Sequence, residues 1–187
     1  MTSASNAPVI LITGGGRGVG AATARLAAAQ GYDVAVSYAS NDAAARAVVA
    51  DVQAQGRRAL AVRADSADPE QVASLFDAVD REFGRLDVLV NNAAIIARQS
   101  RLEDLDFARI QRIFAVNSIG PMLCAQQAAR RMSQRHGGQG GAIVNVSSGA
   151  ARLGSPNEYV DYAASKGALE SFTIGFSKEV AREGIRV

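Results

Sequence analysis

The sequence has few of the side chains that build metal centres and nucleophilic triads. Its 187 residues include one cysteine, Cys124, one histidine, His136, and no tryptophan. A single cysteine excludes an internal disulfide and suits a reducing compartment such as the cytoplasm. One histidine and one cysteine also argue against a zinc site or a Ser-His-Asp triad. We therefore expect no bound metal, and any chemistry has to use other groups.

An excess of charge of one sign and a long apolar run are absent as well. The 20 Lys and Arg residues are interspersed with 18 Asp and Glu residues, so the net charge is only +2. This pattern lacks the basic stripe of a nucleic-acid binder, and no apolar run reaches the length of a transmembrane helix. The segment Met1 to Pro8 has neither the basic nor the apolar region of an export signal. The sequence thus predicts a cytoplasmic protein without a nucleic-acid or membrane partner.

Strand and helix signals alternate along the whole chain. Short apolar and β-branched runs predict strands at 9–12, 33–38, 59–64, 87–92 and 142–147, and a sixth that begins at Ile185. Helical spacing and stop signals predict helices over 21–30, 42–55, about 69–84, about 104–135 with an irregularity at 117–121, and about 157–183. Such alternation implies an α/β fold with a parallel sheet covered on both faces. A chain of 187 residues predicts a single domain over 1–187.

A glycine-rich stretch, Thr13 to Gly20, lies between the first predicted strand and the first predicted helix. A turn this tight needs residues without a Cβ, and backbone N–H groups at a helix N-terminus can hold a pyrophosphate. Glycine-rich turns also occur in ordinary strand–helix units, but the strand–turn–helix context favours a dinucleotide-binding loop. The expected cofactor contacts in this stretch are Gly14, Gly16, Arg17, Gly18, Val19 and Gly20.

Polar residues also follow three other predicted strands. Asp65 follows the third, Asn91-Asn92-Ala93-Ala94 the fourth, and Ser147-Ser148 the fifth. In a doubly wound sheet, ligands bind beyond the carboxyl ends of the strands. We therefore expect these groups to line one crevice that begins at the glycine-rich stretch.

Tyr162 and Lys166 are four residues apart in the last predicted helix, so their side chains share one face. A nearby ammonium favours the phenolate form of a tyrosine and suits it to acid–base chemistry. A Tyr–Lys pair on an ordinary helix surface is the alternative. Only two of the 20 basic residues are lysines, however, so Lys166 is not the default basic residue of this chain. The rival phenol, Tyr159, has Ala163 four residues after it.

Two further polar residues are candidates for the same site. The hydroxyl of Ser148, at the end of the fifth strand, is suited to bind a substrate carbonyl oxygen; capping of a turn is the alternative, and Ser147 competes for either role. Asn117 lies in a predicted helix although asparagine is a poor helix former. It is suited to hold a water or a backbone carbonyl, or it is a kink residue ahead of Gly120-Pro121.

The sequence resembles the short-chain dehydrogenase/reductase family over nearly its whole length. The resemblance rests on an ordered set of motifs: Thr13-Gly14-x-x-x-Gly18-x-Gly20, Asp65, Asn91-Asn92-Ala93, Asn117, Ser148 and Tyr162-x-x-x-Lys166. It implies a Rossmann-type, doubly wound, three-layer fold. It also implies an NAD(P)-dependent oxidoreductase acting on a carbonyl or an alcohol, similar to 3-oxoacyl reductases and glucose-dehydrogenase-like enzymes.

The resemblance implies a role for each matching residue. Tyr162 would be the general acid in reduction and the general base in oxidation, and Lys166 would bind the nicotinamide ribose and favour the phenolate. Ser148 would orient and polarise the substrate carbonyl, and Asn117 would hold a water in the proton relay. The remaining implied cofactor contacts are Asp65 and Ser66 beside the adenine, and Asn92 and Ala93 near the ribose.

The second strand indicates which cofactor is preferred. NAD-binding sites of this type carry an acid near the end of that strand to bind the ribose hydroxyls. Here Tyr38, Ala39, Ser40 and Asn41 stand there, and no carboxylate occurs before Asp42. Arg17, in the glycine-rich stretch, is suited to meet a 2′-phosphate, so we expect NADP(H) rather than NAD(H), with Ser40 and Asn41 among its contacts.

The sequence departs from the family pattern in two places. Ala94 replaces the glycine of the usual Asn-Asn-Ala-Gly motif. Family members also continue past the sixth strand into a substrate-binding lobe, whereas this chain ends at Val187, so we expect it to be C-terminally incomplete. A non-catalytic dinucleotide-binding relative and an inactive fold remnant stay open as alternatives.

The resemblance also implies a homotetramer or a homodimer. In similar proteins, the helices that correspond to about 104–135 and 157–183 pair between subunits. Leu169, Phe172 and Phe176 belong either to such a contact or to the core.

Overall fold

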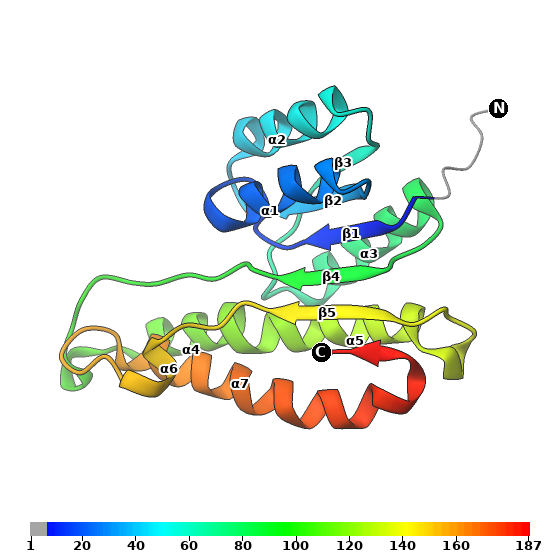
Figure 1. Cartoon of the computed structure of the whole chain (residues 1–187). Coiled ribbons are helices and arrows are strands. Elements are labelled where there is room, and N and C mark those ends of the chain that lie inside the picture. Colours follow the sequence, from blue (N-terminus) through cyan, green and yellow to red (C-terminus); the bar gives the residue numbers. More distant parts are fainter. Residues whose placement is uncertain (1–6) are drawn as a thin grey trace.

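The apolar, β-branched runs form one parallel sheet of six strands (Figure 1). The computed structural model describes residues 7–187, so most of the segment Met1 to Pro8, for which no export signal is predicted, lies outside the described residues. The strands are β1 (Val9–Ile12), β2 (Asp33–Tyr38), β3 (Ala59–Arg63), β4 (Val88–Asn91), β5 (Gly141–Asn145) and β6 (Ile185–Arg186). The predicted doubly wound sheet is confirmed.

The strand order is β3-β2-β1-β4-β5-β6. The chain moves outward from β1 to β3 and then returns to β4 on the other side of β1. Ile12, the last residue of β1, is therefore paired with Val36 on one side and Val90 on the other. At such a reversal the connections leave in opposite directions and open a crevice beyond the carboxyl ends of the strands.

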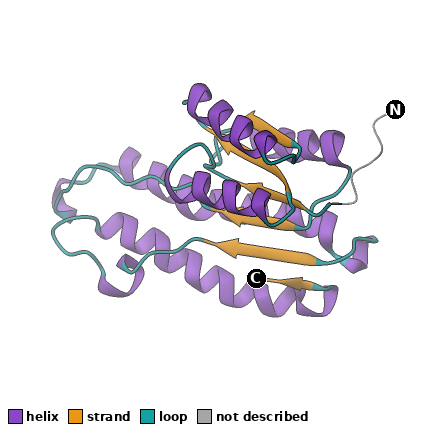
Figure 2. Cartoon of the chain, turned by 45° about the horizontal axis from the view of Figure 1, so that its top comes forward, coloured by secondary structure: helices purple, strands orange, loops and turns teal. Residues whose placement is uncertain are grey.

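Helices cover both faces of the sheet, which gives three layers (Figure 2). Side chains alternate along β1: Val9 and Leu11 enter one buried cluster, and Ile10 and Ile12 enter another. The first cluster includes residues of α3 (Pro69–Phe83), α5 (Gly120–Met132) and α7 (Val160–Val180). The second includes residues of α1 (Gly18–Ala29) and α2 (Asp42–Ala54).

Helix α3 forms as its sequence predicts. The side chain of Asp68 accepts hydrogen bonds from the backbone N–H groups of Glu70 and Gln71, and Pro69 occupies the first turn. At the other end Gly84 has φ +73, a conformation that glycine adopts without strain. The apolar residues at helical spacing, Val72, Leu75, Phe76 and Val79, are all buried.

The two long predicted helices are more broken than expected. The first consists of α4 (Phe107–Phe114), a π-helical turn η2 (Ala115–Ile119) and α5, between the 3-10 turns η1 (Leu102–Asp104) and η3 (Gln134–His136). The second begins at Val160 rather than Asn157, because Asn157 has φ +61. The short helix α6 (Ala150–Leu153) precedes it, and the 3-10 turn η4 (Ala181–Glu183) follows it.

Candidate active site

A cavity of about 470 Å³ opens at the reversal of strand order. Its walls are the glycine-rich loop after β1, the segment after β2, and the ends of β3 and β4. The lining residues are Gly14, Gly16, Arg17, Gly18, Val19, Ser37, Tyr38, Ala39, Ser40, Asn41, Ala44, Ala64, Asp65, Ser66, Asn92, Ala93, Ala94, Ile95, Arg112 and Val116. Most residues expected to contact the cofactor therefore share one cavity, whereas Gly20, Tyr162 and Lys166 do not line it.

The glycine-rich loop presents the N-terminus of α1 to this cavity. Gly14 has φ +65, and Gly18, the first residue of the helix, has φ +54. Arg17 at the N-cap makes no side-chain capping bond, and the first turn carries no acidic side chain. The N–H groups of this turn are thus not satisfied from within the helix, which suits them to bind an anion.

Asn92 holds this loop in place rather than leaving its amide free for a ligand. Its Nδ2 donates to the carbonyls of Thr13 (2.9 Å) and Gly14 (3.1 Å). In return, Thr13 Oγ1 accepts from the backbone N–H groups of Asn92 and Ala93, both at 3.0 Å. The end of β4 is therefore fastened to the end of β1. The motif marks Thr13 only as its first residue, and the structure shows that its hydroxyl also links β1 to β4.

At the end of β2, the carboxylate nearest the cavity is already engaged. Tyr38 donates its hydroxyl to Asp42, and Arg46 pairs with the same carboxylate. The hydrogen bond to Asp42, together with burial, raises the pKa of Tyr38. The bonds from Tyr38 and Arg46 hold the pKa of Asp42 below its ordinary value. By contrast, the guanidinium of Arg17 is exposed and makes no hydrogen bond or ion pair within residues 7–187.

Asp65 lines the cavity and forms an ion pair with Arg112, which the sequence does not predict. Its Oδ2 lies 2.7 Å from Nη2 of Arg112, a residue of α4 that also lines the cavity. Burial raises the pKa of Asp65, but the N–H of Ala67 and the Arg112 guanidinium outweigh it and hold the pKa below its ordinary value. The two partners are 47 positions apart, so no local sequence signal joins them.

Tyr162 and Lys166 share one face of α7, beyond the inner end of the cavity. Lys166 is buried, and its Nζ donates to the carbonyl of Val146 at 2.7 Å. The same Nζ lies 5.9 Å from the centroid of the Tyr162 ring. Burial lowers the pKa of Lys166 below its ordinary value. Since Val146 is two residues before Ser148, this hydrogen bond fixes the Tyr–Lys face of α7 against the segment that carries Ser148.

The two serines after β5 have different partners. Ser147 Oγ donates to Oε1 of Glu170 on α7 at 2.9 Å. Ser148 Oγ accepts a bond of 3.2 Å from the N–H of Ala150, at the start of α6. The capping role considered for Ser148 is therefore present. Within the described residues the Ser148 hydroxyl proton has no acceptor and can be donated to a ligand, whereas Ser147 donates its proton to Glu170.

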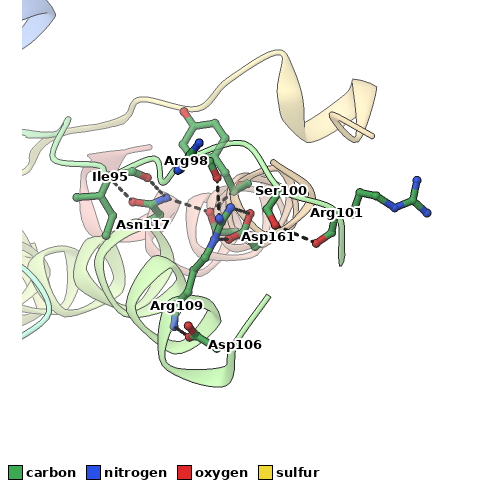
Figure 3. A network of polar contacts seen from close by, with 10 residues as sticks. Ile95, Arg98, Ser100, Arg101, Asp106, Arg109, Asn117 and Asp161 are labelled. Carbon is green, nitrogen blue, oxygen red and sulfur yellow. Dashed lines mark hydrogen bonds and ion pairs between the residues drawn. The ribbon is translucent and has the colours of Figure 1, made fainter. Parts of the chain in front are cut away.

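Asn117 is fully buried in the π-helical turn and joins three segments (Figure 3). Its Oδ1 accepts from the N–H of Ile95 (2.8 Å), and its Nδ2 donates to the Ile95 carbonyl (2.9 Å) and to Ser165 Oγ (3.2 Å). Ser165 Oγ in turn donates to the carbonyl of Tyr162 at 2.7 Å. Asn117 thus binds a backbone carbonyl, one of the two expected arrangements, and links the loop after β4 to α7.

Other kinds of site find no support in the described part of the chain. Within residues 7–187, no three His, Cys, Asp or Glu side chains gather as metal ligands would. Cys124 is buried in α5, where burial raises its pKa to about 12. None of the helices in this part of the chain has both the length and the apolar character needed to cross a bilayer.

Comparisons with known proteins agree with this geometry. The family model described as short chain dehydrogenase matches residues 8–187. The chain is 50% identical over 179 residues to the uncharacterized oxidoreductase YgfF of Escherichia coli K12, covering 96% of this chain and 72% of that protein. It is 37% identical over 185 residues to a 3-oxoacyl-acyl-carrier-protein reductase of Synechocystis, covering 99% and 73%.

A solved structure is similar over the same region. It is a short chain dehydrogenase from Burkholderia cenocepacia in complex with NADP, with a TM-score of 0.88 and 41% sequence identity. The similarity covers 96% of this chain and 71% of that one.

Proposed function

Since the chain belongs to the short chain dehydrogenase family, we propose that it is an oxidoreductase that uses NADP(H) to interconvert a carbonyl and an alcohol on a small molecule. One observation carries the proposal: the hydrogen bond from Lys166 to Val146. It ties the buried ammonium, whose Nζ also lies 5.9 Å from the Tyr162 ring centroid, to the segment after β5 that carries Ser148 two residues later. When bound, the cofactor supplies the hydride, and the protein supplies orientation and proton management.

The residues that line the cavity suit a dinucleotide in their chemistry. The open N–H groups of α1 suit a pyrophosphate, and an added Cβ at Gly14 would lie 2.9 Å from the backbone of Ala93, so only glycine leaves this wall of the cavity intact. Asp65 and Ser66 line the adenine side in this proposal. Ile95 and Val116 line the inner end, where the nicotinamide would lie nearest α7.

In this proposal two side chains donate protons to the substrate oxygen, and two others position the groups around it. The Tyr162 hydroxyl gives a proton to the carbonyl oxygen in reduction and takes it back in oxidation. Ser148 donates its free hydroxyl proton to the same oxygen. One of the three N–H groups of the Lys166 ammonium donates to the Val146 carbonyl, and the other two can donate to the cofactor ribose and the phenol. Both Nδ2 protons of Asn117 are used, so a relay water has to bind its main chain or the second lone pair of Oδ1.

A preference for NADP(H) is the finer part of the proposal. Asp42, the first carboxylate after β2, is paired with Arg46, bonded to Tyr38 and not part of the cavity lining, so we do not assign it to the ribose hydroxyls. The guanidinium of Arg17, which has no partner within residues 7–187, belongs to a residue that lines the cavity and suits a 2′-phosphate. The similar structure from Burkholderia cenocepacia, which is a complex with NADP, also supports this preference.

Two phenols at the start of α7 provide the test: Tyr162 lies in the first turn of the helix, and Tyr159 is its N-cap residue. Tyr162→Phe removes the proposed proton donor, whereas Tyr159→Phe removes the rival phenol and serves as the matched control. We expect Tyr162→Phe to abolish NADPH-dependent turnover of a panel of aldehydes and ketones and to leave the NADPH dissociation constant within about twofold of the parent. Tyr159→Phe should retain both.

The outcomes separate the candidate functions. Turnover by Tyr162→Phe at the parental rate would contradict the proposed mechanism. A parent chain that binds NADPH and turns over none of the panel favours the non-catalytic dinucleotide-binding relative. A folded parent chain that binds neither NADPH nor NADH would contradict the cofactor assignment.

Assembly and location stay predictions. Leu169 belongs to the core, but the stacked rings of Phe172 and Phe176 line a groove of about 410 Å³ together with Met122 of α5. We propose this α5–α7 face as the contact of a homodimer or homotetramer. The single buried thiol, Cys124, suits a reducing compartment, and we propose a cytoplasmic location.

A further inference from the structure

A buried ion pair joins α4 to the first turn of the helix that carries Tyr162 (Figure 3). Arg109 Nε lies 2.8 Å from Oδ2 of Asp161, and its Nη2 lies 3.2 Å from Oδ1. The side chain of Asp161 is only 2% exposed and that of Arg109 17%. A two-point bond between a guanidinium and a carboxylate fixes orientation as well as distance. None of the roles proposed above uses either residue.

The same guanidinium also holds the loop after β4. Its Nη1 donates to the carbonyl of Arg98 at 2.6 Å. The backbone N–H of Arg109 donates to Asp106, which caps α4, so the helix that carries the guanidinium is itself anchored. Arg109 thus adds to the other attachments of this loop, in which Asn117 binds Ile95 and the N–H of Ser100 donates to the carbonyl of Glu158 just before α7.

At the start of α7 the pair adds a side-chain contact that the N-cap residue does not provide. Its N-cap residue, Tyr159, makes no side-chain capping bond. Asp161 lies in the first turn, where a carboxylate is favourable, and its carboxylate also attracts the backbone N–H of Tyr162. Burial raises the pKa of Asp161, but Arg109 and that N–H outweigh it and hold the pKa below its ordinary value. The carboxylate therefore stays charged and paired at neutral pH.

We propose that Arg109 and Asp161 are positioning residues, which set the loop of residues 95–101 and the Tyr162 turn of α7 in one fixed relation. The inference rests on the proposed function and adds to it. Arg109 bonds both to the Arg98 carbonyl of this loop and to Asp161, the residue before Tyr162, so the pair sets the position of the loop relative to the proton donor of the proposed function. Neither residue lines the nucleotide cavity. Loss of the pair should therefore reduce turnover and leave cofactor binding intact.

The test removes both charges together, because a single truncation would leave an unpaired buried charge and destabilise the fold. The variant is Arg109→Met with Asp161→Asn, which keeps the side-chain sizes. The matched control is Arg57→Met with Asp33→Asn. That pair is buried to a similar degree, with side chains 23% and 2% exposed and a 2.6 Å contact, but it lies at the amino end of β2.

Three measurements are compared in the parent and both double variants. We expect the NADPH dissociation constant to stay within about twofold in all of them. We expect kcat for carbonyl reduction to fall at least tenfold in the Arg109/Asp161 variant only. Amide hydrogen exchange in residues 95–101 and 160–164 should become at least tenfold faster in that variant only. The single variant Arg109→Lys keeps the charge but loses the planar guanidinium, so we expect its kcat to lie between those of the parent and the Arg109/Asp161 variant.

A spectroscopic reading keeps the test independent of turnover. The chain has four tyrosines, so ¹³C-labelled tyrosine gives a spectrum in which Tyr162 is assigned by its loss in Tyr162→Phe. We expect the Tyr162 signal to move in the Arg109/Asp161 variant and to stay in place in the control. If the parent has no activity, the proposed function fails, whereas exchange and the Tyr162 signal still decide the positioning role. Unchanged exchange and an unmoved Tyr162 signal would overturn it.

Discussion

Gly20→Ala tests the junction between the glycine-rich loop and β4. Gly20 lies in the first turn of α1, and a Cβ added there would stand 2.6 Å from Asn92 Nδ2, 2.6 Å from the Gly14 carbonyl oxygen and 3.0 Å from the Gly15 Cα. Ordinary contacts begin at 3.4 Å, so the closest two atoms are about 0.8 Å too near. Two of the three atoms belong to the backbone, and hence a side-chain rotation cannot relieve the overlap.

The loss of folding free energy in Gly20→Ala depends on which groups the added Cβ displaces. Overpacking of this kind costs about 1–3 kcal/mol. Displacement of Asn92 also breaks its two hydrogen bonds to Thr13 and Gly14, at about 1 kcal/mol each. Replacement of glycine by alanine inside a helix returns about 1 kcal/mol. We therefore expect the free energy of unfolding to fall by about 2–4 kcal/mol and NADPH affinity to fall at least tenfold, because the loop moves away from the cavity.

Urea denaturation and NADPH titration measure both effects. The denaturation midpoint should drop with an unchanged m-value, since the same surface is exposed on unfolding. Gly175→Ala is the matched control: Gly175 is an exposed position of α7, and beyond the backbone of its own helical turns no atom of residues 7–187 lies within 4 Å of an added Cβ. It should stabilise the chain by about 0.5–1 kcal/mol and leave NADPH binding unchanged. A Gly20→Ala chain with the parental midpoint and the parental NADPH affinity would refute the close approach as the reason for glycine.

Two further predictions concern single side chains. Arg17→Ser should weaken NADPH binding about tenfold, or ~1.4 kcal/mol, and leave NADH binding nearly unchanged; equal weakening of both in parallel titrations would contradict the 2′-phosphate contact. Burial raises the pKa of Cys124 from 9.0 to about 12, so the native thiol should resist a disulfide reagent at pH 8.5 and react only as the chain unfolds. Because the pKa of the thiol is higher in the folded chain, this group adds stability below pH 9.0 that is lost as the pH rises toward 12. In Cys124→Ala the urea denaturation midpoint should therefore fall less steeply with pH over this range.

The sequence predicts features that are encoded locally. The strand, glycine turn and helix around Thr13 to Gly20 are read from neighbouring residues, and so are the cap of α3 at Asp68 and its stop at Gly84. Alternation of strands and helices then limits the topology, because parallel strands require crossover connections. The order of the six strands and the crevice at β1 and β4 follow from that limit.

Ion pairs and hydrogen bonds between residues far apart in the chain cannot be predicted from local sequence signals. Asp65 with Arg112 and Asp161 with Arg109 are separated by 47 and 52 positions, and arginine is the common basic residue here, so no single arginine stands out. The amide of Asn92 illustrates the same limit. Its motif marks it as close to the cofactor, but only the folded backbone shows that its hydrogen bonds are spent on Thr13 and Gly14.

The π-helical turn at Asn117 shows how such long-range demands change local structure. Asparagine is unfavourable in an uninterrupted helix through Ala115–Ile119, because its side chain competes with the helix by bonding to nearby backbone. Here the side chain instead bonds to Ile95, 22 positions earlier, and to Ser165, 48 positions later. The extra residue of a π-turn re-aims one side chain without ending the helix. The irregularity that the sequence shows at 117–121 is therefore the local sign of a contact among three segments, and its position beside Tyr162 follows from that contact.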